Sequence, residues 1–238
     1  MYEERKYRGW AHAPWCVPLC FRESDVVVYA DRALPREPLD DALRNVYHAI
    51  GSYAQQKPAF HHSLSSLPPD EDAPAIVRQM LSVSRRTGIG PFAAVAGAVA
   101  QAVGETARTL GAREILVENG GDVYLWIQIP KTVGVYAGEQ FPVPLEIRVP
   151  ARKRPFGIAS SSARIGHSLN LGRADLVTVI AASAPLADGF ATAYSNRVRT
   201  AADAQKVLAR AKARPDVYGI LVCVEDRLFL QGEIELSG

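Results

Sequence analysis

The chain has 238 residues, 48% hydrophobic and 22% charged, enough to bury the core of one large domain or of two interlocked lobes. Its formal net charge of +2 gives no electrostatic reason to expect binding to nucleic acid or to a membrane surface. The first six residues lack an apolar stretch, and Ile89 to Val103 is shorter than the roughly 18–20 residues of a membrane span. We therefore expect a cytoplasmic protein without a signal peptide.

The cysteines give little support for disulfides or for zinc. The three cysteines are Cys16, Cys20 and Cys223. They are too few and too unevenly spaced for a disulfide framework. A structural zinc site needs four ligands, so His12 with Cys16 and Cys20 would require His61-His62 as a complement. We interpret the thiols as core and surface residues, with Cys223 in the core.

The first half of the chain alternates between strand and helix signals. Residues 20–30 are predicted to form two strand segments or one bent strand, and apolar residues at helical spacing predict a helix from Pro38 to Gln56. Ser63 to Pro74 holds three prolines and several acids, which makes it the best candidate for a junction between lobes. A second helix is predicted from Ala75 to about Arg86.

The next predicted helix, Phe92 to Leu110, consists largely of alanine and glycine. A glycine inside a helix is about 1 kcal/mol less favourable than alanine, so Gly97 and Gly104 indicate close contact with something. A second helix or a sheet is the simpler candidate. A ligand passing the N-terminus of the helix is the alternative.

Two apolar runs then flank a glycine pair. Residues 115–117 and 123–127 are predicted strands, and Gly120-Gly121 between them permits positive φ and close approach of another molecule. Asn119 and Asp122 flank the pair with short polar side chains. The pattern predicts a β-hairpin turn that could also form the floor of a ligand cleft.

The second half of the chain contains more strands and two helices. Strand structure is expected within 131–149, 175–181, 218–224 and 228–236, with a closing turn at Asp226-Arg227, and helices are expected from about 183 to 198 and from 201 to 213. A short strand near residue 156 leads into Ser160, Ser161 and Ser162, followed by Arg164 and His167. Serine runs are usually loops, but ligand sites also concentrate at strand ends.

The helix that follows Ser183 carries polar residues on one face. Asp188, Thr192 and Ser195 are spaced i, i+4 and i+7. Asp188 could only complement the helix dipole, whereas Asp and Thr together offer two hard oxygen atoms that suit Mg²⁺ or Ca²⁺ and not zinc.

Three segments together resemble a known family. Residues 90–100, 116–122 and 187–193, the last containing Ala187-Asp188-Gly189-Phe190-Ala191-Thr192-Ala193, occur in the order found in the ApbE family of FAD:protein FMN transferases, in particular its small ApbE-like branch. The resemblance covers residues 88–198, about half of the chain. It implies a single α+β domain in which mixed or antiparallel sheets pack against helices.

The resemblance also implies a site and partners. Asp188, Thr192 and a carbonyl near Ala93 or Ala94 would bind Mg²⁺ against the pyrophosphate of FAD, and His167 matches the family's histidine. The family transfers the FMN half of FAD to a Thr or Ser of an acceptor protein and releases AMP, so a small-molecule nucleotide is the expected ligand. The acceptor is unknown, and a homo-oligomer stays open. Apart from the resemblance, the glycine turn and the serine segment give the residues that we expect to contact FAD or FMN: Asn119, Gly120, Gly121, Asp122, Ser160, Ser161, Ser162 and Arg164.

Two departures from the family pattern keep several functions open. Val95-Ala96-Gly97 stands where the family has Ala-Lys-Gly, and the Asp-Pro-x-Thr-Gly that follows the family's histidine is absent after His167. We therefore keep three hypotheses: a Mg²⁺-dependent flavin transferase or FAD pyrophosphatase, a non-catalytic flavin- or nucleotide-binding relative, and a structural protein.

Overall fold

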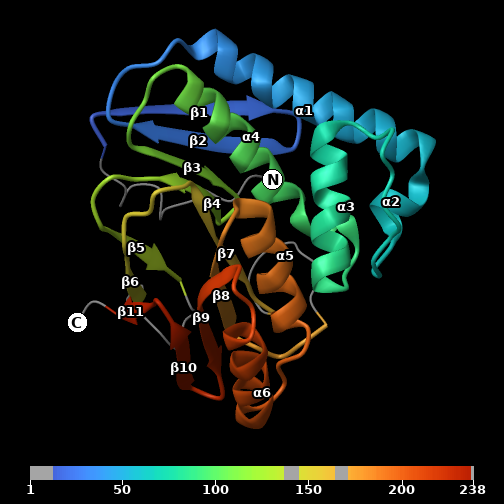
Figure 1. Ribbon diagram of the computed structural model, residues 1–238, viewed down its shortest axis with the longest axis vertical. Helices are drawn as coiled ribbons and strands as arrows, with labels where there is room; N and C mark the ends of the chain where they lie inside the picture. Colours follow the sequence, from blue (N-terminus) through green and yellow to red (C-terminus); the bar gives the residue numbers. More distant parts are fainter. Residues whose placement is uncertain (1–12, 137–144, 164–170, 237–238) are drawn as a thin grey trace.

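Helices cover one face of a large antiparallel sheet, and a smaller sheet covers part of the other face (Figure 1). This computed structural model describes residues 13–136, 145–163 and 171–236. The helices are α1 (Arg36–Gln56), α2 (Pro58–His62), α3 (Ala75–Thr87), the 3₁₀ helix η2 (Pro91–Ala94), α4 (Val95–Thr109), α5 (Ala184–Ser195) and α6 (Ala201–Lys212).

The large sheet has eight strands in the order β1-β2-β3-β4-β7-β8-β9-β10, and the small one has the order β11-β6-β5. Every pairing between the described strands is antiparallel. The α+β prediction is therefore confirmed. The strands are β1 (Trp15–Phe21), β2 (Ser24–Ala30), β3 (Ile115–Asn119), β4 (Asp122–Trp126), β5 (Lys131–Val135), β6 (Leu145–Val149), β7 (Phe156–Ser161), β8 (Leu176–Ala181), β9 (Val217–Val224), β10 (Arg227–Gly232) and β11 (Glu235–Leu236).

The two faces of the large sheet can be followed by alternation along its strands. On β4, Tyr124 joins the core under α1 and α4, whereas Val123 and Leu125 join the core shared with β5 and β6. On β7, Ala159 faces α5, while Phe156 and Ile158 face the small sheet. Polar residues can therefore share one site only if they lie on the same face of the sheet.

Helices α4 and α5 lie side by side over the middle of the large sheet (Figure 1). Helix α4 packs on β3 and β4, α5 packs on β7 and β8, and the two helices contact each other. The glycines inside α4 explain how they fit: a Cβ on Gly97 would lie 2.5 Å from the carbonyl oxygen of Ala184, and one on Gly104 would lie 2.2 Å from the ring of Tyr124. The expected close contact of α4 is therefore with a helix and a sheet.

Several predicted boundaries need correction. Residues 228–236 were predicted as one strand, but β10 ends at Gly232, which has a φ of +87°, and β11 then pairs with β6 in the other sheet. The closing turn is Glu225-Asp226, both with positive φ, so Arg227 already belongs to β10. Helix α5 ends at Ser195 rather than near Val198.

The predicted strand structure of residues 20–30 is two strands that form a hairpin. The first begins at Trp15, earlier than expected, and the hairpin turns at Arg22, where φ is 53°. The predicted helices over 38–56 and 75–86 are confirmed within two residues at each end.

The proline-rich connector is held to the helices around it. Tyr53 on α1 donates a hydrogen bond of 2.7 Å to Asp70, which also pairs with Lys57. Ser65 forms a β-bridge with Ile89 next to η2. A lobe junction at 63–74 stays a prediction. Among the described helices, none is both long and apolar enough to cross a membrane.

The cysteines should differ sharply in reactivity. Cys16 and Cys20 on β1 are exposed, whereas Cys223 is buried in β9, as predicted. Burial, assisted by the charge of Asp175, raises the pKa of Cys223 to about 12, so little thiolate forms at neutral pH. A thiol-specific reagent should label the two exposed cysteines at least about a hundredfold faster than Cys223.

Mass spectrometry of the labelled native protein measures this difference. A Cys16→Ser/Cys20→Ser variant should label only after unfolding by denaturant. Fast labelling of that variant under native conditions would contradict the buried position of Cys223.

Candidate functional site

Helix α5 is buried almost all round, including the face that carries its polar residues. Ser183 caps its N-terminus by accepting a hydrogen bond of 3.4 Å from the Leu186 amide, and Pro185 occupies the first turn. Every residue of α5 is buried apart from half-buried Thr192. The helix contacts α3, α4, β7 and β8, so even the face that carries Asp188 is covered.

The Asp188 carboxylate lies at the N-terminus of α4. The Gly97 amide donates a hydrogen bond of 2.9 Å to Oδ2 of Asp188. Gly97 lies in the first turn of α4, where amides have no partner within the helix, and the N-cap residue Ala94 supplies no side-chain acceptor. Asp188 therefore caps α4 from another helix, and its negative charge lies at the positive end of the α4 dipole.

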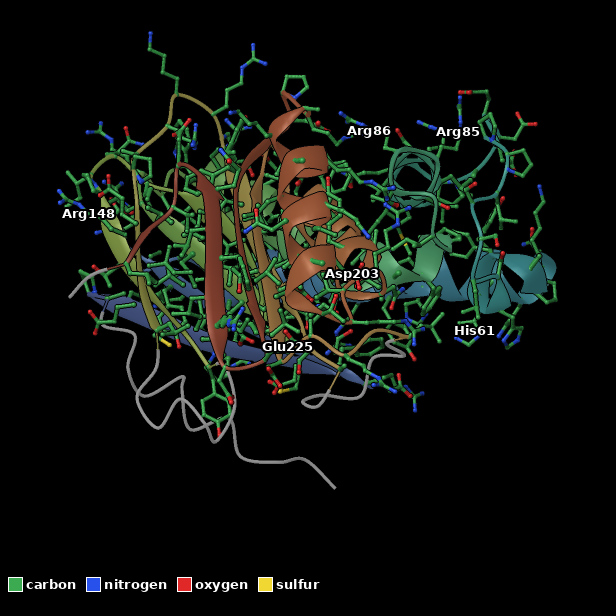
Figure 2. All side chains as sticks on the ribbon, turned by 90° about the horizontal axis from the view of Figure 1, so that it is seen from below. His61, Arg85, Arg86, Arg148, Asp203 and Glu225 are labelled. Atoms are coloured by element: carbon green, nitrogen blue, oxygen red, sulfur yellow. The ribbon has the colours of Figure 1, made fainter. Side chains whose placement is uncertain are left out.

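Burial decides the ionisation of Asp188. With 8% of its surface exposed, desolvation raises its pKa to about 7, while the hydrogen bonds from the Gly97 and Ala96 amides act in the opposite direction. No cationic side chain within the described residues pairs with it. The cationic side chains of Arg85, Arg86 and Arg148 are exposed, whereas Asp188 is buried (Figure 2). A bound cation would offset this desolvation and favour the carboxylate form of Asp188.

The Asn119-Gly120-Gly121-Asp122 segment is a β-hairpin turn, as predicted. Gly120 and Gly121 have φ of 68° and 98°, and the Gly121 amide donates a hydrogen bond of 2.8 Å to Glu118. Asn119 reaches away from the turn, because its Nδ2 donates a hydrogen bond of 3.1 Å to the Ala96 carbonyl of α4. The end of β3 is thereby joined to the same turn of α4 that holds Asp188.

Asp122 and the two turn glycines lie beside this contact. Asp122 is buried and pairs directly with Asn119 in the register of β3 and β4. It lies two residues before Tyr124 on β4, so both face the helices. A Cβ on Gly121 would meet nothing within 4 Å, which leaves open space at the tip of the hairpin.

The serine run is divided between the two faces of the sheet. Ser160 lies two residues after Ile158, so both face the small sheet, and the Ser160 hydroxyl lies 2.8 Å from the hydroxyl of Thr178 on β8. Ser161 lies two residues after Ala159, so both face α5. Ser160 thus lies on the opposite face from Asp188. Both serines belong to β7 and not to a loop, and Ser162 follows the strand. Arg164 and His167 lie outside the described residues.

The two remaining predicted metal ligands lie on elements that contact each other. Thr192 is one helical turn after Asp188, and Ala93 belongs to η2, which packs against α5. Both residues are half-buried. The described residues contain no group of three His, Cys, Asp or Glu side chains arranged to hold a metal ion. Of the three predicted ligands, Asp188 offers a carboxylate, and Thr192 and Ala93 offer neutral oxygen atoms.

A family model described as AbpE bacteria matches residues 12–225. The chain belongs to this family. The match extends beyond the segment 88–198 that carried the resemblance and lies on both sides of the connector at 63–74. UPF0280 proteins from Methanocella arvoryzae and Methanospirillum hungatei are 33% and 35% identical to this AbpE chain, each over 90% of the chain and 86% of the relative.

Solved ApbE structures share the fold of this AbpE chain. The flavin transferase ApbE from Vibrio cholerae superposes with a TM-score of 0.65 at 11% identity, covering 92% of this chain and 98% of the other. The Pseudomonas stutzeri flavinyl transferase ApbE in its apo form gives 0.61 at 13% identity, covering 91% and 93%. The expected ApbE-like fold is confirmed.

Sequence reasoning missed how the residues of this candidate site are held together. Gly97 and Asp188 are 91 residues apart, and Asn119 and Ala96 are 23 apart. Capping patterns are recognised in sequence when the acceptor lies just before the helix, and here it comes from another helix. The glycine itself was the available signal, since Gly97 in a helix indicated a close neighbour.

Proposed function

We propose that the chain binds FAD, or a related nucleotide diphosphate, together with Mg²⁺ at Asp188, Thr192 and Ala93, and cleaves the diphosphate. The FMN half would pass to a hydroxyl group of an acceptor protein or to water. The observation that carries the proposal is the buried Asp188 carboxylate, which the Gly97 amide holds by one oxygen at the N-terminus of α4. Membership of the AbpE family supports the choice of ligand.

The donor atoms suit Mg²⁺ bound together with a phosphate ligand. A carboxylate, a hydroxyl and a backbone carbonyl are hard oxygen donors, and Mg²⁺ usually combines one or two carboxylates with substrate phosphates and water. Because Gly97 occupies Oδ2 of Asp188, we assign Oδ1 to the metal. When bound, the ion would neutralise charge on the phosphate oxygens. One carboxylate is a weak site alone, so Mg²⁺ and the nucleotide should bind cooperatively.

The proposed reaction is a displacement at the FMN phosphorus. The oxygen of a serine, a threonine or water forms a bond to that phosphorus, and the bond from it to the bridging oxygen breaks. AMP leaves with the bridging oxygen, and the hydroxyl proton passes to a base. His167 is our candidate for that base by resemblance. Arg164 is our candidate for a phosphate contact, because a guanidinium group suits phosphate. The remaining contribution of the chain is to hold the diphosphate and its cation beside Asp188.

The nucleotide-binding residues in the proposal lie on the helix-facing side of the sheet. The Cβ position of Gly121 adjoins open space at the tip of the turn. Asn119, Asp122 and Ser161 face the helices beside the turn. Ser162 follows the end of β7. We leave Ser160 out, because its hydroxyl bonds Thr178 on the other face.

A non-catalytic nucleotide-binding protein is the second candidate. Ala96 stands where the family has a lysine, so this turn of α4 brings no cation to the phosphates. Its carbonyl instead accepts a hydrogen bond from Asn119. Such a protein would bind FAD with Mg²⁺ and leave it intact.

Incubation with FAD and Mg²⁺ tests the proposed reaction. The wild-type protein should release AMP and form FMN, free or attached to an added acceptor peptide, and a chelator should stop the reaction. Asp188→Ala should lower the rate at least about a hundredfold, because several kcal/mol of charge stabilisation are lost. Thr192→Val should have a smaller effect, since a neutral ligand is removed.

Chromatographic separation of FAD, FMN and AMP measures the outcome. Asp41→Ala, which removes an exposed carboxylate from α1, is the control and should turn over like wild type. Binding of FAD without AMP, even after long incubation, would reject the enzyme and favour the second candidate. If FAD does not bind at all with Mg²⁺ present, both are rejected.

A further inference from the structure

A single peptide group at the start of α4 is held from two sides. Its carbonyl, on Ala96, accepts the 3.1 Å hydrogen bond from Asn119, and its amide, on Gly97, donates the 2.9 Å hydrogen bond to Asp188. One partner comes from the end of β3 and the other from the middle of α5. The sheet and the two central helices of the fold thus meet at this peptide.

The simpler account of Asn119 is that it only shapes the hairpin turn. An Asn before a glycine pair often bonds the turn backbone. Here Glu118 accepts the hydrogen bond from the Gly121 amide, and the two glycines supply the positive φ values. The Asn119 side chain is 9% exposed and donates to α4 instead. The turn therefore does not account for the contact that Asn119 makes.

The peptide has little freedom to shift towards α5. A Cβ on Gly97 would approach the backbone of Ala184 and Pro185 to within 2.5–2.9 Å, so α4 and α5 are already in close contact there. Hydrogen bonds at the two ends of one peptide strengthen each other, because acceptance at the carbonyl polarises the amide. Loss of the Asn119 bond would therefore weaken and misplace the bond from Gly97 to Asp188.

We propose that Asn119 is a positioning residue that acts on Asp188 through the Ala96–Gly97 peptide. By fixing this peptide, Asn119 keeps Oδ2 of Asp188 bound to Gly97 and turns Oδ1 towards the cation and phosphate ligand. The role towards the ligand rests on the proposed function above. The hold on the peptide can be tested without any ligand.

Asn119→Leu removes the donor while keeping a side chain of similar size. Gln101→Leu is the matched control: Gln101 on α4 accepts a hydrogen bond of 3.3 Å from the Ala184 amide of α5, so its loss also removes a side-chain bond between elements. This hydrogen bond does not involve the Ala96–Gly97 peptide. Both variants should melt at similarly reduced temperatures, because each loses one partly buried hydrogen bond.

Two measurements separate positioning from a general loss of stability. Amide hydrogen exchange at Gly97 should become about tenfold faster in Asn119→Leu and stay unchanged in Gln101→Leu. Calorimetric titration of Mg²⁺ in the presence of FAD should show about tenfold weaker binding in Asn119→Leu only. Asn119→Gln retains the donor, so its Gly97 exchange rate and its Mg²⁺ affinity should lie between those of Asn119→Leu and wild type.

The outcomes distinguish the two proposals. If Gly97 exchanges at the wild-type rate in Asn119→Leu, or if both variants lose the same Mg²⁺–FAD affinity, the positioning role is wrong. Faster exchange at Gly97 in a protein whose wild type does not bind Mg²⁺ and FAD would reject the proposed function. It would then limit Asn119 to holding the start of α4.

Discussion

Replacing Asp188 with asparagine should stabilise the metal-free protein at about pH 8, although the same change should abolish the proposed chemistry. Burial raises the Asp188 pKa to about 7, against an ordinary value of 3.8. The carboxylate form is therefore the unfavourable form in the folded protein. Asparagine cannot ionise, and its side-chain oxygen can still accept the hydrogen bond from Gly97.

The direction of the pH dependence follows from this raised pKa. Below about pH 4 the carboxyl is protonated in both folded and unfolded chains, so it does not affect folding. Between about pH 4 and 7 the unfolded chain releases its proton while the folded one retains it, so wild-type stability falls as pH rises. Above about pH 7 the loss is complete, about 2–4 kcal/mol, and Asp188→Asn should avoid it.

Thermal unfolding in the presence of a chelator measures the effect. For a chain of this length, the variant should melt roughly 5–10 °C higher than wild type at about pH 8 and at nearly the same temperature at about pH 4. Asp203→Asn is the control of opposite sign, because hydrogen bonding to Lys206 lowers the Asp203 pKa. If Asp188→Asn melts at or below the wild-type temperature at about pH 8, ionised Asp188 is not destabilising.

A carboxylate that destabilises the folded protein supports a binding role for Asp188. A residue kept for stability alone would be better as asparagine here, since the helix cap needs only an acceptor. A charge that weakens the folded protein is instead typical of sites that bind an ion or a substrate. Added Mg²⁺ and nucleotide should therefore stabilise wild type and not Asp188→Asn.

Features encoded by neighbouring residues could be predicted from the sequence. The apolar stripe of α1, with Leu39, Leu43 and Ile50 buried, repeats at helical spacing, and Gly120-Gly121 supplies the positive φ of its own turn. The pair Asp188 and Thr192 was likewise found from spacing within one helix. In each case the determining residues lie within a few positions of each other.

Features that depend on distant partners could not be predicted in the same way. The direction in which Ser160 points depends on whether β7 continues through the serine run. Because Ser161 pairs with Val177 on β8, the strand includes both Ser160 and Ser161. The register then turns Ser160 away from α5. Similarly, the spacing within α5 placed its polar residues on one face but could not predict that this face is covered by α3, α4 and the sheet. Neither pairing nor burial is a property of the segment alone.

Gly97→Ala should destabilise the protein, although it adds only one methyl group. The new Cβ would lie 2.5 Å from the Ala184 carbonyl oxygen and 2.9 Å from the Pro185 Cα. These are backbone atoms at the start of α5, so the helix must move as a unit. The gain in helix propensity, about 1 kcal/mol, offsets part of the overpacking, and a net loss of about 2 kcal/mol remains.

Gly51→Ala is the matched control, because Gly51 also lies inside a helix and a Cβ there would meet nothing within 4 Å. It should raise the free energy of unfolding by up to about 1 kcal/mol, while Gly97→Ala lowers it. Denaturant titration of both variants measures the difference. Equal stabilisation by both would show that α4 and α5 are less tightly packed than described. If Gly97→Ala is destabilised as expected, its remaining folded fraction should also bind Mg²⁺ and FAD more weakly, since displacement of α5 carries Asp188 away from the Ala96–Gly97 peptide.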